Sequence, residues 1–411
     1  MEHYSTIIIG GGAAGLFCAA NVTTEYGSVL LLERGERVGK KLSSTGNGQG
    51  NVTNERVGVA PYFSVRGGKV QEKQLQGYFM RYGKKELIEF LEGLGGMLQA
   101  DERGRYYPTG RQASAITDLL RYYVSARGVQ MKTGAYVQSV QKSGGRYAVK
   151  AACEGGEMTF YADNVVLCTG GKAAKNFGTD GNGYQLAKGF SHSVTALYPA
   201  LVQLKTDTRH IKSLKGLRIL SGGVTACVGE RQVCSLQGDV IFTDYGVSGD
   251  AIFRVSSFIA DKIDGGEVSL SIDLLPNVSR QKLLAALTEK KKKYPTLPEG
   301  ELLCGILNNQ VGRAVMKRCG AKGLEAVADG VKAFTLPVVG SLGFDYAQVT
   351  KGGVPLVEVD EDLQSRNAEG LYFAGEILDV DGECGGFNLQ WAYTSAMLCA
   401  EAIARKYGGG A

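Results

Sequence analysis

Short apolar runs separated by helix-like segments mark the start of the chain. Thr6 to Ile9 is an unbroken, β-branched run, which is typical of a strand buried on both faces of a parallel sheet. A helix-like segment follows at 13–21, and a second apolar run occupies 29–32. The pattern therefore predicts a strand, a helix and a second strand within the first 32 residues.

The hydrophobic pattern changes near residue 196. Before it, the stretch 165–171 predicts a strand that ends in glycines, like a third strand of the same sheet. After it, the short segments 201–204, 223–228 and 239–242 alternate with turns, as in an antiparallel barrel-like insert. Residues 280–327 have helical character, whereas 371–374 predict a buried strand and 389–405 a helix.

These changes predict three parts. A discontinuous nucleotide-binding domain occupies 1–195 and 345–411, a barrel-like cap occupies 196–276 and 328–344, and a helical subdomain occupies 277–327. The length of 411 residues suits two or three domains. Apolar residues make up 44% of the chain and charged residues 21%, which excludes a disordered polymer.

Charge and cysteine content indicate a cytoplasmic protein without a membrane or nucleic-acid partner. The net charge of +5 is spread along the chain apart from Lys290 to Lys293, which a solvated helix face explains best. No apolar stretch reaches membrane-spanning length, and the early first strand leaves no room for a signal peptide. Nine scattered cysteines without a CxxC pair, and only three histidines, indicate reduced thiols and no metal site.

A glycine motif follows the first strand directly. Gly10, Gly12 and Gly15 form a GxGxxG frame that opens the helix-like segment, with Ala13 and Ala14 at its start. The first glycine makes the turn, the second lets a pyrophosphate approach the backbone, and the third lets helix and strand pack closely. The helix N-terminus then supplies N–H donors to the anion.

The second strand ends in Glu33, 23 positions after Gly10. A dinucleotide-binding unit places a carboxylate here to bind ribose hydroxyls, and such a carboxylate would repel a 2′-phosphate. Arg34 follows it, and Lys40 and Lys41 offer cations that can lie along a pyrophosphate, although Lys41 is equally well explained as a surface lysine.

Thr45 to Asn51 reads TGNGQGN, which contains no apolar residue. A run of this kind, taken alone, is most simply a linker. Its position, shortly after a dinucleotide-binding unit, favours a second function: backbone that approaches a flat ligand closely because it carries few Cβ atoms.

Several motifs together resemble one family. GGGAAG, the acid at 33 and GKKLSSTGNGQGNVTN are similar to the bacterial flavoproteins called BaiN/YhiN-like or aminoacetone-oxidase-like NAD(P)/FAD-dependent oxidoreductases. The segments 104–108, 166–171, 242–249, 349–354 and 370–390 follow in the same order as in that family. One difference concerns chemistry, because the family's Arg-Cys in the glycine loop is Gln49-Gly50 here.

The resemblance implies an α/β, Rossmann-like FAD-binding domain of the type with two dinucleotide-binding domains, carrying the barrel-like insert and the small helical domain. It implies bound FAD and a transient NAD(P)H. The residues predicted to contact the cofactor are Gly10, Gly12, Ala13, Ala14, Gly15, Glu33, Arg34, Lys40, Lys41, Thr45, Gly46, Asn47, Gly48, Gln49, Gly50, Asn51, Val137, Thr169, Gly170, Gly171, Gly375, Glu376, Asp379, Gly386, Phe387, Asn388 and Leu389.

Within that set, three expectations are specific. The resemblance implies that the backbone of Val137 contacts adenine and that Asp379 lies on the ribityl side. Residues 385–388 begin a helix whose N-terminus can stabilise reduced flavin. Turn and cap roles explain Asp381 and Glu383 better, and Cys384 lacks a second thiol at CxxC spacing.

Candidate acid–base groups are few. Tyr198 and Tyr245 can donate a hydrogen bond to a substrate carbonyl, although each is also a natural packing residue. His192 and His210 fit structural or exposed positions. The nucleotide site is therefore much better defined than the substrate site.

Three functions stay open. The leading hypothesis is an enzyme that passes hydride from NAD(P)H through FAD to an electron-poor C=C bond, with a conjugated 3-oxo steroid or bile acid as the best substrate. The second is an FAD-dependent amine oxidase that releases hydrogen peroxide. The third is a non-enzymatic flavin-dependent module that binds RNA or protein, which the dispersed charge does not favour.

Overall fold

The computed structural model describes residues 3–408 and divides the chain into two units. Unit 1 comprises 1–198 and 349–411, and unit 2 comprises 199–348. The predicted boundaries at 195/196 and 344/345 lie within a few residues of these limits. Each unit has its own apolar core.

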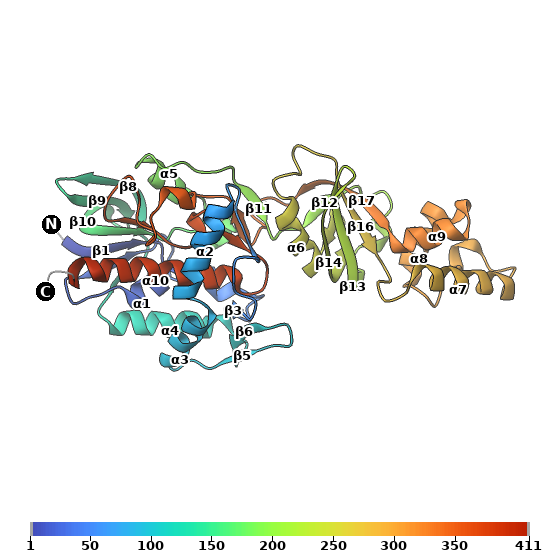
Figure 1. The fold of residues 1–411 in the computed structure, drawn as a ribbon, viewed down its shortest axis with the longest axis horizontal. Helices are drawn as coiled ribbons and strands as arrows, with labels where there is room; N and C mark the ends of the chain where they lie inside the picture. Colours follow the sequence, from blue (N-terminus) through green and yellow to red (C-terminus); the bar gives the residue numbers. More distant parts are fainter. Residues whose placement is uncertain (1–2, 409–411) are drawn as a thin grey trace. The chain divides into compact units, whose positions relative to one another are not determined.

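Unit 1 is built around a seven-stranded sheet (Figure 1). Its strands are β1 His3–Ile9, β2 Val29–Leu32, β7 Gln130–Lys132, β8 Tyr136–Ser143, β9 Arg146–Cys153, β10 Gly156–Leu167 and β19 Leu371–Phe373. The order is β7-β2-β1-β10-β9-β8, with β19 also paired to β10. The pairs among β7, β2, β1, β10 and β19 are parallel, whereas β9 and β8 are antiparallel additions.

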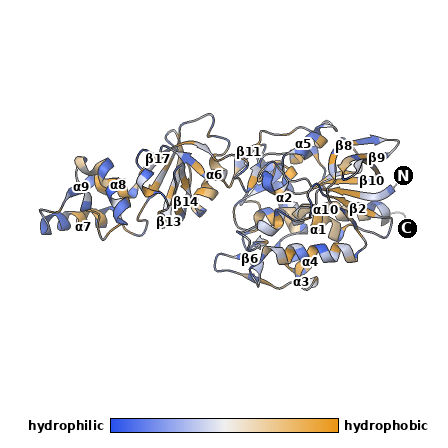
Figure 2. Ribbon diagram, turned by 180° about the vertical axis from the view of Figure 1, so that it is seen from behind, coloured by the Kyte–Doolittle hydropathy of each residue, from blue (hydrophilic) through white to orange (hydrophobic). Residues whose placement is uncertain are grey.

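Helices surround this sheet. They are α1 Ala13–Asn21, α2 Lys69–Arg81, α3 Lys84–Gly93, α4 Ala113–Ala126, α5 Asn182–Lys188 and α10 Phe387–Gly408. The long α10 packs along α1, and both bury small and apolar side chains in the core. Figure 2 shows the apolar strands at the centre of the unit. Short strands complete it: β3 Thr53–Asn54, β4 Tyr62–Phe63, β5 Leu98–Ala100, β6 Arg105–Pro108, β18 Val349–Lys351 and β20 Asp381–Gly382.

Unit 2 contains a closed six-stranded barrel, with β11 Tyr198–Ala200 at the boundary between the units. The barrel strands are β12 Leu204–Thr206, β13 Arg218–Val228, β14 Arg231–Phe242, β15 Gly246–Ser248, β16 Val268–Asp273 and β17 Phe334–Ser341. Helix α6 Asp250–Ile259 packs on β14, and α7 Arg280–Lys293, α8 Asn309–Cys319 and α9 Leu324–Lys332 form a helical layer between β16 and β17 in the chain. No helix within residues 3–408 is long and apolar enough to cross a membrane.

Candidate functional site

The register of the parallel strands brings the predicted nucleotide residues to one edge of the sheet. Ile9 pairs with Leu32 and with Leu167, and Leu167 pairs with Phe373. The residues that follow these strands therefore meet at the carboxyl edge of the sheet, where open α/β folds bind ligands. They include the turn at Gly10.

The three glycines of the motif occupy different environments. Gly10 has a φ of 105°, and an added Cβ would overlap the carbonyl of Cys168. A Cβ on Gly15 would overlap the carbonyl oxygen of Gly10, whereas a Cβ on Gly12 would meet no heavy atom within 4 Å. The first and third glycines thus allow tight packing, and the second faces open space at the N-terminus of α1. This is the arrangement that a pyrophosphate-binding turn requires.

Glu33 is held in place by the turns on either side of it. Its Oε2 accepts a hydrogen bond from the Gly11 N–H at 2.8 Å, and its Oε1 accepts one from the Gly35 N–H at 2.6 Å. Two backbone donors fix the carboxylate beside the glycine turn, at the position where it can reach ribose hydroxyls.

Arg34 and Val137 are both held by residues that sequence reasoning missed. Arg34 pairs with Asp180 at 2.6 Å and stacks over the Tyr136 ring at 4.8 Å. The Val137 carbonyl accepts a hydrogen bond from the Asn182 amide at 2.8 Å. The stretch 180–182, at the start of α5, therefore joins β2 to β8 beside the predicted adenine position.

The glycine loop is compact, which does not suit a flexible linker. Asn47 and the glycines at 46, 48 and 50 all have positive φ, between 55° and 82°. Gly50 lies against α4, because an added Cβ would come within 2.8 Å of the Ala113 Cα. The loop carbonyl of Gly48 accepts a hydrogen bond from the Ala113 N–H at 2.8 Å. A cysteine at position 50, as in the resembled family, would clash with α4 in this conformation.

Lys41 and Glu376 form an ion pair with a distance of 2.9 Å. Glu376 also accepts a hydrogen bond from the Thr350 N–H at 2.8 Å, and the Thr350 hydroxyl accepts from the N–H groups of Lys172 and Ala173. Lys41 therefore has a carboxylate partner, and Lys40 is exposed; their predicted positions along a pyrophosphate stay predictions. Thr350 links the Gly170-Gly171 turn to this pair, a role that sequence reasoning missed.

The turn at Gly375 is fixed by α10. Its N–H donates to the Ser395 hydroxyl at 2.8 Å, and its carbonyl accepts from the Trp391 ring N–H at 3.1 Å. An added Cβ on Gly375 would approach the Ala14 Cβ to 2.8 Å, so α1 and this turn are in close contact. Neither Ser395 nor Trp391 was predicted as a site residue.

The start of α10 lies beside the glycine loop. With its amide in the orientation that satisfies its neighbours, Asn51 accepts a hydrogen bond from the Gly386 N–H at 3.2 Å. Asn388 exchanges two hydrogen bonds of 2.8 Å with the backbone of Gly382. Phe387 is fully buried, and Leu389 is half-buried. The Asn388 side chain thus positions the turn that precedes α10. The N-terminus of α10 lies beside the glycine loop, because Gly386 is hydrogen-bonded to Asn51.

Asp379 is fully buried, and its carboxylate accepts three hydrogen bonds. The donors are the Ser64 hydroxyl at 2.7 Å and the N–H groups of Val65 and Arg66, both at 2.9 Å. These bonds give Asp379 a clear structural task, which is to hold the segment after β4. Its predicted ribityl-side role stays a prediction.

Two buried hydroxyls near the same edge, those of Thr169 and Tyr184, have no hydrogen-bond partner within the part of the chain that the structure describes. Burial is the main cause that raises the pKa of Tyr184, and the nearby carboxylates of Glu376, Asp379 and Asp381 raise it further. The hydroxyl therefore stays protonated and can donate a hydrogen bond. The open side of Gly12, the held carboxylate of Glu33 and these two hydroxyls fit an FAD molecule bound along the carboxyl edge.

The predicted catalytic tyrosines belong to different units. Tyr198 begins β11 at the end of unit 1, and Tyr245 lies between β14 and β15 in unit 2; both are half-buried. His192 is buried, with Nδ1 2.9 Å from Glu358 and Nε2 2.7 Å from the Ser365 hydroxyl, and His210 is exposed. His192 thus has the structural role expected of it, since the same Ser365 hydroxyl also accepts from two backbone N–H groups.

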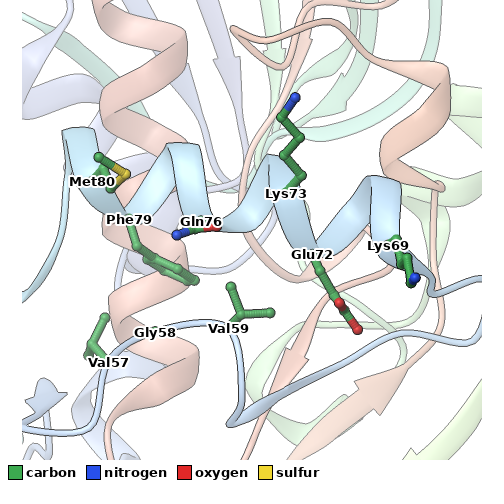
Figure 3. Close-up of a pocket in the computed structure, with 9 residues that line it drawn as sticks. All are labelled: Val57, Gly58, Val59, Lys69, Glu72, Lys73, Gln76, Phe79 and Met80. Atoms are coloured by element: carbon green, nitrogen blue, oxygen red, sulfur yellow. The ribbon is translucent and has the colours of Figure 1, made fainter.

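A groove of about 610 Å³ lies between α2 and the segment 57–59 (Figure 3). In Figure 3 the Phe79 side chain extends towards this segment, whereas Lys73 points to the other side of the helix. Phe79 stacks on Tyr62 at 4.7 Å, and Tyr62 contacts Phe387 at the start of α10. None of the predicted site residues lines this groove.

Comparisons with known proteins bear on the family and the fold. The family model described as the HI0933-like protein Rossmann domain matches residues 4–402. A 3-dehydro-bile acid delta(4,6)-reductase of Clostridium scindens is 33% identical, over 97% of this chain and 98% of its own. Ribosomal RNA dihydrouridine synthases of Haemophilus influenzae and Escherichia coli are each 29% identical, over 99% and 98% of this chain and 100% and 98% of theirs.

Solved structures show the same fold. A 3-ketosteroid-delta4-(5alpha)-dehydrogenase from Rhodococcus jostii RHA1 aligns with a TM-score of 0.56 and 15% identity, covering 98% of this chain and 97% of its own. A 3-ketosteroid delta1-dehydrogenase from Sterolibacterium denitrificans gives 0.54 and 13%, covering 99% and 100%. The predicted fold class, a Rossmann-type FAD-binding domain with an antiparallel barrel and helices, is confirmed.

Proposed function

Since the chain belongs to the HI0933-like family of Rossmann-domain proteins, as its motifs indicated, we propose that it is a reductase of C=C bonds conjugated to a carbonyl group. The family and the site support an FAD-dependent oxidoreductase. The proposed donor is NAD(P)H, which visits the site, and the proposed acceptor is a conjugated 3-oxo bile acid. Bound FAD would supply the hydride chemistry.

The observation that carries this proposal is the full-length likeness to the bile acid reductase, at 33% identity. A 4-ene-3-oxo steroid accepts hydride at the carbon distal to the carbonyl, and negative charge then develops on the carbonyl oxygen. A hydrogen-bond donor at that oxygen lowers the barrier. We propose either Tyr198 of unit 1 or Tyr245 of unit 2 as this donor.

The chain's own residues have defined tasks in this scheme. Glu33 and the turn at Gly12 hold the nucleotide, and the loop 45–51 presents backbone with few Cβ atoms to the flavin. The N-terminus of α10 places a positive dipole end beside the same loop, which favours negative charge there. The Lys41–Glu376 pair lies at the turn at 375, which packs closely against α1.

The test is an anaerobic titration of the purified yellow protein with NADH and with NADPH, followed by addition of a 4-ene-3-oxo bile acid. We expect loss of the flavin absorption near 450 nm with the nucleotide and its return with the enone. The Gly12→Val variant serves as a flavin-free control. In an amine oxidase, the flavin would instead stay oxidised when nucleotide is added, and hydrogen peroxide would be released when an amine is added. That outcome would refute the proposal.

A second acceptor, a uracil base in RNA, is favoured by charge. Residues 277–327 contain ten lysines and arginines and four aspartates and glutamates, an excess of six against +5 for the whole chain. The positive charge is therefore gathered in the helical layer of unit 2 and is less dispersed than we expected. Lys291 and Lys293 are exposed beside exposed Tyr294, and such a surface suits a polyanion.

The two acceptors share one chemistry, because the 5,6-double bond of uracil is conjugated to a carbonyl like that of the steroid enone. The two relatives named as RNA dihydrouridine synthases support the second acceptor at 29% identity. Supplying the reduced protein with a uridine-containing ribosomal RNA fragment in place of the bile acid distinguishes them. The absence of a nucleic-acid partner, predicted above, stays a prediction that this experiment decides.

A further inference from the structure

Three arginines stack on aromatic rings around the start of α10. The Cζ of Arg56 lies 5.4 Å from the centre of the Phe387 ring, and those of Arg105 and Arg111 lie 5.7 and 4.1 Å from the centre of the Tyr107 ring. We refer to these three arginines as the arginine rim. Stacking covers one face of a guanidinium and leaves its in-plane N–H groups able to bind an oxyanion.

The rim lies beside the glycine loop and the N-terminus of α10. The guanidinium of Arg111 donates to the Gln49 side chain at 3.3 Å, and the Cδ of Arg105 lies 3.9 Å from the Cβ position of Gly385. Asn51 joins the same loop to Gly386. A molecule that reaches the loop and the start of α10 therefore passes within reach of these cations.

Arg111 differs from the other two in having no carboxylate partner among the described residues. Arg105 pairs with Asp101, and Arg56 pairs with Glu383 at 3.1 Å. Within residues 3–408, therefore, no ion pair compensates the positive charge of Arg111, whose guanidinium contacts the neutral Gln49 amide and the Tyr107 ring.

The backbone holds Arg111 in a costly conformation. Its φ is 50°, in the left-handed region that non-glycine residues rarely adopt. Its N–H donates to the Pro108 carbonyl at 2.7 Å, and the next turn is joined to the glycine loop through Ala113 and Gly48. Strain of this kind is often found where a side chain must be placed for binding.

We propose that Arg111, with the rest of the arginine rim, binds an anionic group of the substrate at a distance from the double bond that is reduced. The inference rests on the proposed function and adds a specificity site to it. The ligand chemistry is a carboxylate or phosphate oxyanion, supplied by the side-chain carboxylate of a bile acid or by the phosphodiester of an RNA. A bidentate guanidinium–oxyanion contact fits either source.

The experiment compares acidic and neutral substrates that share one reacting group. The full-length FAD-loaded protein and its Arg111→Gln and Arg111→Lys variants are assayed with a 4-ene-3-oxo bile acid and with its methyl ester. Arg121→Gln is the control, because Arg121 lies on α4, the helix that begins just after Arg111, and also stacks over a tyrosine, Tyr122, at 5.1 Å. Thermal melting checks that each variant is folded.

We expect the ratio of kcat/KM for the acid to that for the ester to fall at least tenfold in Arg111→Gln, to recover in part in Arg111→Lys, and to stay at the wild-type value in Arg121→Gln. The same ratio for a uridine-containing oligonucleotide against uridine tests the phosphate source. A ratio unchanged in Arg111→Gln with both pairs would overturn the proposal.

A binding measurement separates this inference from the proposed function. Titration calorimetry of the oxidised protein with cholate, which has the carboxylate and no enone, and with a uridine tetranucleotide does not require turnover. Binding that weakens at least tenfold in Arg111→Gln supports the rim even if no enone is reduced. Equal affinities of wild type and Arg111→Gln for both probes refute it, whatever the activity assays give.

Discussion

Replacing Gly12 by valine separates cofactor binding from folding. The backbone at Gly12 has φ −78° and ψ −163°, an extended conformation that any residue adopts. An added Cβ meets no heavy atom within 4 Å. The flavin-free protein should therefore accept valine with a change in the free energy of unfolding of no more than about 0.5 kcal/mol. The space that valine fills is the space that the pyrophosphate needs.

The expected loss of affinity follows from the contacts that are blocked. Two hydrogen bonds from the turn to a charged phosphate contribute about 1.5–3 kcal/mol each, or about 3–6 kcal/mol together. Because about 1.4 kcal/mol corresponds to a tenfold change, the dissociation constant of FAD should rise by roughly 10² to 10⁴. Quenching of flavin fluorescence on titration with apoprotein measures this constant, and circular dichroism gives the melting temperature without flavin.

Gly15→Ala is the contrasting variant. Its Cβ would overlap the carbonyl oxygen of Gly10, so the cost falls on folding, about 1–3 kcal/mol. If Gly12→Val binds FAD stoichiometrically and with the wild-type dissociation constant, the assignment of the nucleotide site is refuted. If the melting temperature falls in Gly12→Val as much as in Gly15→Ala, the conclusion that Gly12 faces open space is wrong.

Three further predictions concern side chains that hydrogen bonds hold in place. Glu33→Ala leaves the Gly11 and Gly35 donors without their acceptor, so FAD binding should weaken about tenfold or more in the same fluorescence titration. Asp379→Ala removes the acceptor of three donors in 64–66 and should cost about 3 kcal/mol in urea unfolding, with faster tryptic cleavage after Arg66; wild-type cleavage would contradict this. Burial lowers the pKa of His192 below its usual 6.5 or so, so the folded chain binds fewer protons than the unfolded chain just below that pH. The free energy of unfolding should therefore fall as the pH drops below about 6.5, and His192→Gln should reduce that slope between pH 7 and pH 5.

The nucleotide-binding unit was predictable because its signals are local. Strand, glycines, helix, strand and acid follow one another within 33 residues, and each glycine has a separate steric reason. The helix at 13–21 and the strand at 29–32 occur where the pattern placed them. The apolar run that begins the sheet predicts burial on both faces, and β1 is buried from Tyr4 to Ile9.

The partners of the site residues were not predictable. Lys41 meets Glu376, 335 positions later, and Asn51 meets Gly386 at a similar separation. No spacing rule connects residues so far apart, because their contact depends on which strands pair and in which register. For the same reason, Lys41 was left open between a pyrophosphate contact and a surface position, and Thr350 was not assigned at all.

The amino-acid sequence by itself determined which segments form the dinucleotide-binding unit, since period, turn chemistry and glycine sterics act over a few residues. It also determined that the loop at 45–51 would carry few Cβ atoms and so leave its backbone accessible. Only the tertiary structure decided what that loop contacts: α4 through Gly50, α10 through Asn51 and the uncompensated charge of Arg111 through Gln49. Those contacts arise because the parallel sheet brings the ends of distant strands to one edge, and a charge acts on whatever the fold places within a few ångströms of it.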